Sequence, residues 1–146
     1  MDIFKMLILL AVLLLPAGCD LPEEGDIDDV KSGSAVEICN STASDEFDLD
    51  TVTIEGDSLK MHVWYGGGCQ VHDFNLCWNG IFTESVVVQA TLQLIHDSNQ
   101  DMCEALISAP ITFDLTPLKT AWQKKYQEIF GTIQIKFSNK ILSYSF

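Results

Sequence analysis

The chain has 146 residues, which is enough for one domain with a short additional segment. Its 21 acidic residues outnumber 8 basic ones and give a formal net charge of −13. Nucleic acid binding needs clustered lysine and arginine side chains that neutralise phosphates, and the sequence has no such cluster. The acidity also opposes charge-driven docking on anionic lipid. Composition therefore argues against nucleic acid as a partner.

The N-terminal residues have the layout of an export signal. Lys5 precedes the purely apolar run Leu7–Leu15, and small residues follow that run. The run is too short to span a bilayer, which requires about 20 apolar residues. We therefore predict a secretory signal peptide over residues 1–18.

The residues that follow the apolar run indicate lipid attachment. Leu15-Pro16-Ala17-Gly18-Cys19 resembles the lipobox of bacterial lipoproteins, although that family prefers leucine where Pro16 stands. The resemblance implies cleavage before Cys19, a diacylglycerol on its sulfur and a membrane contact through that lipid. Each buried methylene contributes about 0.8 kcal/mol, so several acyl chains would anchor the protein firmly. The alternative is ordinary secretion with Cys19 left as a thiol.

Residues 19–35 are acidic and have no hydrophobic period. Such a segment buries too little apolar area to offset its ordering entropy, so we predict a flexible tether there and a folded domain over residues 36–146. Three tether acids, Asp26, Asp28 and Asp29, lack the glycine and glutamate of a calcium loop. We interpret them as solvated charge.

From Val36 onward, apolar residues mostly alternate with polar ones, which is typical of half-buried strands. The pattern predicts strands at 51–55, 59–65, 71–78, 88–96, 103–115, 133–137 and 141–146. Asn79-Gly80 predicts a tight turn, and 97–101 a hairpin loop. Pro110 indicates a bend or a sheet edge.

One helix interrupts the strands. Thr116 is the expected N-cap and Pro117 the first helical residue, while Gly131 is the expected stop. Leu118, Trp122 and Tyr126 recur every four residues and form its apolar stripe. Together these patterns predict a mainly β fold, an antiparallel β-sandwich or open barrel of about seven or eight strands with one short helix.

Four cysteines remain besides Cys19, and an even number in an exported protein favours disulfides. Cys69 lies just before His72, and His96 lies just before Cys103. If their strands are neighbours, these four side chains meet at one end of the core. The triple glycine before Cys69 would let the backbone approach closely there.

Three interpretations of this cluster compete. The first is a Cys69–Cys103 disulfide with His72 and His96 as structural neighbours, and the second is a zinc or copper site formed by all four residues. The third is a reactive cysteine with a histidine base, which lacks a recognisable orienting group or oxyanion site. We favour the disulfide, with a second one between Cys39 and Cys77. We assign Asp101 to loop chemistry.

Two other features carry weaker expectations. His62 is expected on the surface, because it lies on the polar face of its strand. The pair Trp64–Tyr65 would grip a sugar or a peptide if both rings were exposed.

The motif Gly67-Gly68-Cys69-x-x-His72-x-Phe74-x-Leu76-x-Trp78 resembles small bacterial lipoproteins of unknown function. The resemblance implies an exported, lipid-anchored β-domain on the periplasmic or outer side of the cell envelope, with no established activity. We find no motif that assigns a catalytic residue or a cofactor. We therefore expect a non-catalytic binding or structural protein with an unknown protein or small-molecule ligand, and a metal-binding protein as the alternative.

Overall fold

The computed structural model describes residues 30–31 and 34–146. The predicted signal peptide over residues 1–18 and the predicted lipidation site Cys19 lie outside the described residues, as does most of the tether predicted over 19–35. Within the described residues, no helix is both long enough and apolar enough to span a membrane.

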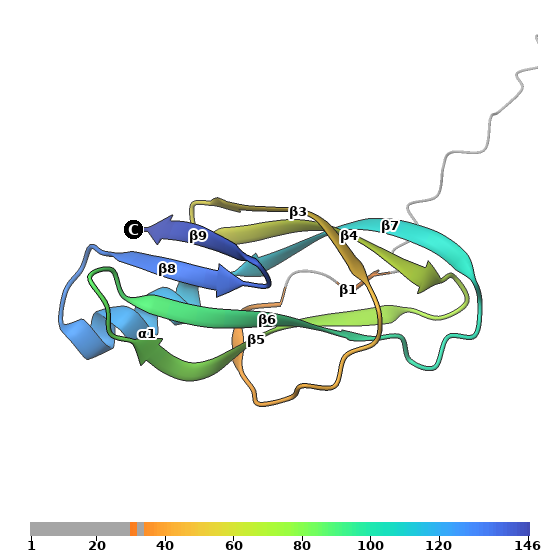
Figure 1. Ribbon diagram of the computed structural model, residues 1–146, viewed down its shortest axis with the longest axis horizontal. Coiled ribbons are helices and arrows are strands. Elements are labelled where there is room, and N and C mark those ends of the chain that lie inside the picture. Colours follow the sequence, from red (N-terminus) through yellow and green to blue (C-terminus); the bar gives the residue numbers. More distant parts are fainter. Residues whose placement is uncertain (1–29, 32–33) are drawn as a thin grey trace, which may run out of the picture.

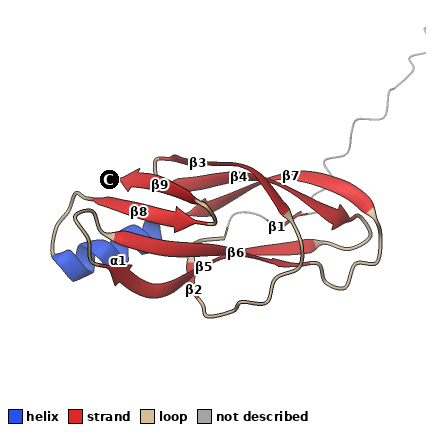
Figure 2. Cartoon of the chain, in the orientation of Figure 1, coloured by secondary structure: helices blue, strands red, loops and turns tan. Residues whose placement is uncertain are grey.

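The described residues form nine strands and one helix (Figures 1 and 2). In chain order these are β1 (Val30–Lys31), β2 (Glu37–Ile38), β3 (Asp48–Glu55), β4 (Ser58–Gly67), β5 (His72–Thr83), β6 (Gln89–Asp97), β7 (Ala105–Asp114), α1 (Thr116–Tyr126), β8 (Thr132–Phe137) and β9 (Lys140–Ser145).

The strands form two sheets with a shared core. One sheet has the order β3-β4-β7, and the other has the order β1-β5-β6-β8-β9 with β2 also paired to β5. Figure 1 shows α1 at one end of the long axis and the loops after β4 and β6 at the opposite end. The prediction of a mainly β, sandwich-like fold with one short helix is confirmed.

The sheets are not purely antiparallel, and that part of the prediction is wrong. β1 and β2 pair with β5 in parallel, and β8 pairs with β6 in parallel. Parallel neighbours need a crossover connection rather than a tight hairpin. For β8 that connection runs through β7 and α1, which return the chain to the end of the sandwich where β6 begins (Figure 1).

The core is built from the alternating faces that the sequence indicates. On β5, the inward face carries His72, Phe74, Leu76 and Trp78, each at most 5% exposed. β7 lies at the edge of its sheet, which is the position that Pro110 predicts. The largest fully buried side chains include Tyr144, Phe74, Phe113, Leu59, Leu76, Leu92, Ile111, Leu115, Leu118, Ile133 and Ile135.

Two predicted turns are wrong for physical reasons. Asn79 and Gly80 do not end a strand, because β5 continues through them with an irregularity between Trp78 and Phe82. The Trp78 indole N–H donates to the carbonyl of Ile81 (3.1 Å), so the extra residues form a bulge that keeps the strand in the sheet. The loop 97–101 is no hairpin, because β6 and β7 belong to different sheets.

The helix begins and ends differently from the prediction. Leu115 occupies the N-cap position, and the Thr116 N–H donates to Oδ1 of Asp114 (2.8 Å). The helix ends at Tyr126 with Gln127 as its C-cap, whose φ of 57° is left-handed, and Gly131 plays no part in the stop. Pro117 lies in the first turn, as predicted.

Gly131 has a packing role instead of a helix-stop role. A Cβ atom on Gly131 would lie 2.2 Å from Cη2 of Trp122, and the Gly131 backbone pairs with Phe146 in both directions. Gly131→Ala should therefore destabilise the fold by about 1–3 kcal/mol through overpacking. Urea unfolding measures this, with Gly66→Ala as the matched control because its Cβ meets nothing within 4 Å. Equal stability of both variants would contradict this account.

Candidate functional site

Two disulfides fix the described part of the chain. Cys69 is bonded to Cys103, and Cys39 is bonded to Cys77, which are the pairs favoured from the sequence. Cys69 lies in the crossover from β4 to β5, and Cys103 lies in the crossover from β6 to β7. The first bond therefore joins two of the connections that pass between the sheets. Loops of this size contribute roughly 3–4 kcal/mol each by restricting the unfolded chain.

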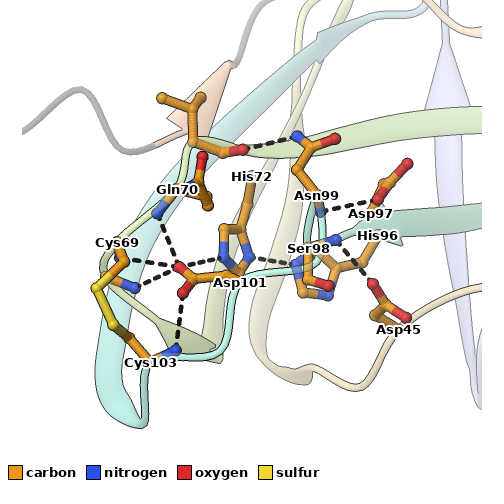
Figure 3. A network of polar contacts seen from close by, with 12 residues as sticks. Asp45, Cys69, Gln70, His72, His96, Asp97, Ser98, Asn99, Asp101 and Cys103 are labelled. Carbon is orange, nitrogen blue, oxygen red and sulfur yellow. Dashed lines mark hydrogen bonds and ion pairs between the residues drawn. A yellow bond between two sulfur atoms is a disulfide. The ribbon is translucent and has the colours of Figure 1, made fainter.

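Asp101 lies inside this end of the sandwich and accepts hydrogen bonds from both crossovers (Figure 3). Its Oδ2 accepts the backbone N–H groups of Gly68, Cys69 and Gln70, each at 2.9 Å. Its Oδ1 accepts the N–H of Cys103 at 2.8 Å. The side chain is 0% exposed. These hydrogen bonds, led by that from Cys103, hold the pKa of Asp101 well below its usual range, so the group is a buried carboxylate.

Two buried histidines continue the network from Asp101. Nε2 of His72 lies 3.2 Å from Oδ2 of Asp101, and Nδ1 of His72 lies 2.8 Å from Nε2 of His96. Nδ1 of His96 lies 3.1 Å from the carbonyl oxygen of Glu46. The two histidines are 0% and 2% exposed. Burial lowers the pKa of His96, and the neighbouring His72 lowers it further.

Aromatic rings and a glycine hold the imidazoles in place. The His96 ring stacks on Phe74 with centroids 4.4 Å apart, and the Tyr65 ring lies 4.6 Å from His72. A Cβ atom on Gly67 would lie 2.5 Å from Nε2 of His72. The triple glycine predicts a close approach of the backbone, and the structure has one: the Gly67 backbone packs against the imidazole ring of His72.

The segment of residues 44–47, here called the strap, runs from the β6 edge to β3. The His96 N–H donates to Oγ of Ser44 (3.0 Å), and the Asp45 N–H donates to the carbonyl of His96 (2.9 Å). Oδ2 of Asp45 accepts the N–H of Ser98 (2.8 Å). Hydrogen bonds from the side chain and the backbone of Ser98 lower the pKa of Asp45. The strap is therefore fastened to the end of β6 next to the histidine pair.

A groove of about 950 Å³ lies between the strap and the β8–β9 turn. The pairing of β6 with β8 ends at Leu92, and the strap bonds the same edge again at His96. No described strand pairs with Gln93 and Leu94 on this side. The lining comprises an apolar and aromatic part (Phe47, Leu49, Trp64, Tyr65, Leu92, Leu94, Leu106 and Phe137), three acids (Asp45, Glu46 and Asp48) and one cation (Lys140), besides small polar residues.

The structure brings together the four side chains that the sequence analysis placed at one end of the core, but it does not form the alternative sites. A zinc or copper site would need thiolates, and the sulfurs of Cys69 and Cys103 are bonded to each other. The reactive-cysteine alternative lacks a free thiol for the same reason. His72 and His96 instead contact each other.

Other expected residues need correction. Trp64 is 38% exposed but Tyr65 is only 3% exposed, so the two do not form an exposed aromatic pair. His62 is half-buried, and its Nδ1 lies 3.7 Å from Oδ2 of Asp50 across the β3–β4 pair. The role of Asp101 goes beyond the predicted loop chemistry. Its bond with Cys103 is local, but it also accepts N–H groups from residues 68–70, which belong to the other crossover. In the sequence, this role is indicated only by the position of Asp101 close to Cys103, whose predicted disulfide partner Cys69 follows three glycines.

No protein-family model and no curated protein matches the chain. Among solved structures, a protein from Parabacteroides distasonis ATCC 8503 described as toxin-related matches with TM-score 0.50 and 14% identity, covering 79% of this chain and 59% of its own. A NigD-like immunity protein from Bacteroides caccae ATCC 43185 matches with TM-score 0.50 and 17% identity over the same shares. The chain thus spans about 59% of the length of these proteins.

A protein from Bacteroides fragilis NCTC 9343 described as a lipoprotein aligns with TM-score 0.47 and 9% identity, over 80% of this chain and 69% of its own. At these identities the likeness concerns the fold alone. The fold is thus shared with bacterial proteins, which agrees with the coarse part of the resemblance drawn from the sequence.

Asp101→Asn tests whether the carboxylate holds the two crossovers together. An amide has one oxygen and no charge, so it cannot replace all the hydrogen bonds that both carboxylate oxygens accept. We expect a clearly lower midpoint of urea unfolding than for the wild type. Glu104→Gln is the matched control, because it removes one exposed acid from the same loop. A midpoint for Asp101→Asn equal to that of the control would contradict this role.

Proposed function

We propose that the chain is a lipid-anchored protein of the bacterial cell envelope, with a non-catalytic β-sandwich that binds a partner. The lipobox-like residues ending at Cys19 support the anchor. The two disulfides support an oxidising compartment, where such bonds persist. Asp101, the histidine pair and the paired cysteines are engaged with one another and with the backbone, which supports a binding role over a catalytic one.

The groove beside the strap carries the binding proposal. It combines exposed apolar side chains, such as Trp64 and Leu106, with the short β6 edge at residues 93–94, which no described strand pairs on this side. Open sheet edges bind extended segments through main-chain hydrogen bonds, while adjacent side-chain pockets select the sequence. The groove therefore fits an extended peptide segment better than a compact ligand.

The acidic residues around the groove indicate the charge of the segment that binds there. Asp45, Glu46 and Asp48 border the groove, Lys140 is the one cation among the lining residues, and the chain carries a net charge of −13. Complementary charge steers association and excludes like-charged partners. An indole face also attracts cations. We therefore assign the groove to an extended, lysine- or arginine-bearing segment of a partner protein.

The fold comparison suggests one candidate within this class. One structural neighbour is described as a NigD-like immunity protein and another as toxin-related. A protein toxin with a basic extended segment would be a partner of the required chemistry, and Trp64→Ala should weaken its binding as it weakens that of any other cationic partner.

Cys19→Ala tests the anchor. The variant should move from the membrane fraction to the soluble or secreted fraction of the bacterial host, because it loses the sulfur that carries the diacylglycerol. Asp20→Ala is the control and should stay with membranes. Mass spectrometry of the N-terminal peptide should show acyl additions in the wild type and in Asp20→Ala. Membrane retention of Cys19→Ala equal to that of the wild type would refute lipid anchoring.

Trp64→Ala tests the groove. The probe is an alternating lysine–leucine peptide, titrated by NMR against its glutamate–leucine counterpart. Removing a central aromatic contact typically costs more than 1 kcal/mol, so Trp64→Ala should weaken binding roughly fivefold or more. Phe130→Ala is the matched control, because Phe130 is exposed just after α1 and does not line the groove. Equal binding by both variants, or by both peptides, would refute the assignment.

A further inference from the structure

The network from Asp101 to Glu46 constrains the number of protons that the two histidines hold. It contains three contacts in series, which join Asp101 to His72, His72 to His96, and His96 to Glu46. Each contact needs one hydrogen atom between its two heavy atoms. The two imidazoles supply four ring nitrogens, and a neutral imidazole carries one N–H.

Both ends of the network only accept hydrogen bonds. Oδ2 of Asp101 already accepts three backbone N–H groups, which leaves no place for a proton on that oxygen. The Glu46 group is a backbone carbonyl, which never donates. The outer nitrogens, Nε2 of His72 and Nδ1 of His96, must therefore both carry hydrogen.

The inner contact then decides the charge. Nδ1 of His72 and Nε2 of His96 lie 2.8 Å apart, so one of them must donate to the other. Three hydrogens on the four ring nitrogens amount to one proton more than two neutral imidazoles hold. We propose that His72 and His96 share one buried proton, with Asp101 as counter-ion, and that this proton fastens the strap to the end of β6.

The surroundings favour one proton and oppose a second. The titratable groups facing the pair are the carboxylates of Asp101 and Asp45, from the loop after β6 and from the strap, and the Tyr65 phenol from β4. The stacked ring of Phe74 and the edge of Phe47 are uncharged. One cation is balanced by the buried Asp101 carboxylate, whereas two adjacent imidazolium rings would repel each other across the inner contact.

Loss of the shared proton acts on the strap. Asp101 is charged, so it keeps the N–H of His72 Nε2. Nδ1 of His72 then accepts from Nε2 of His96, and Nδ1 of His96 is left with a lone pair facing the Glu46 carbonyl. That contact turns from attractive to repulsive, and it is the hydrogen bond that joins the imidazole ring to the strap. Addition of a second proton instead breaks the inner contact.

The effect of pH on stability has two sides. The shared proton stabilises the folded state for as long as the pair holds it, so this stabilisation is lost when the pH rises far enough to remove the proton. The second proton is refused by the folded pair but accepted by the unfolded chain, so stability also falls as pH drops below about 6.5. The free energy of unfolding should therefore pass through a maximum near neutral pH.

This proton also bears on the groove, a consequence that rests on the proposed function. The strap residues Asp45, Glu46 and Phe47 form one wall of the groove. Release of Glu46 from His96 would therefore weaken binding of the cationic peptide at alkaline pH. The proton count itself does not depend on any ligand.

Nitrogen-15 NMR of the full chain in detergent, labelled at histidine and titrated from pH 5 to 9, tests the proposal. The chain has three histidines, so His62 serves as an internal reference. At pH 7 we expect protonated outer nitrogens on His72 and His96, and an inner pair that shares one hydrogen. The backbone amide of Phe47 should shift at the same alkaline pKa that removes this hydrogen.

Three results would overturn the proposal. They are two neutral imidazoles at pH 7, an unprotonated Nδ1 of His96 at that pH, or a Phe47 amide that does not follow the titration. His62→Asn should leave the titration unchanged, whereas Asp101→Asn, where it folds, should lower the alkaline pKa by removing the counter-ion. The peptide experiment separates the two proposals, because a normal proton count with no peptide binding would reject the groove alone.

Discussion

The carboxylate of Asp101 is the interaction on which the disulfide end of the sandwich depends. β4 and β5 lie in different sheets, as do β6 and β7, so two crossovers meet at this end. Their backbone N–H groups cannot join a sheet ladder, and buried donors without partners are costly. Asp101 belongs to one crossover and accepts N–H groups from both, so it satisfies these donors while the Cys69–Cys103 bond holds the chains covalently.

A buried carboxylate normally opposes folding, because it loses its hydration. Here four backbone donors and an imidazole replace the water around its two oxygens. The remaining imbalance is one negative charge, and a single proton on the histidine pair cancels it. The same chain of contacts then reaches the Glu46 carbonyl, which ties the strap to the sheet. A charge introduced to close the crossovers thereby also positions one wall of the groove.

The sequence predicts most of the fold because alternation of apolar residues is a local signal, and β4, β5 and β6 follow it. It also predicts that Cys69, His72, His96 and Cys103 converge, since their positions at strand ends are visible. It does not predict which sheet each strand joins, and so mistakes the 97–101 crossover for a hairpin. The sequence does not predict the strap or the groove either. Both form where β8 stops pairing with β6, and the register of these two strands is set by tertiary packing and not by a local pattern.

Residues 35–39, at the N-terminal side of the domain, are bonded to both sheets. Ala35 bridges Asp114 on β7, Glu37 and Ile38 pair with β5, and Cys39 is bonded to Cys77 on β5. The chain that would lead to a lipid anchor therefore contacts both sheets before it enters the core. β2 pairs with β5 over two residues only, so the Cys39–Cys77 disulfide is the covalent restraint that keeps this segment on the sheet. Such an attachment fits the proposed role of a binding domain on a lipid anchor.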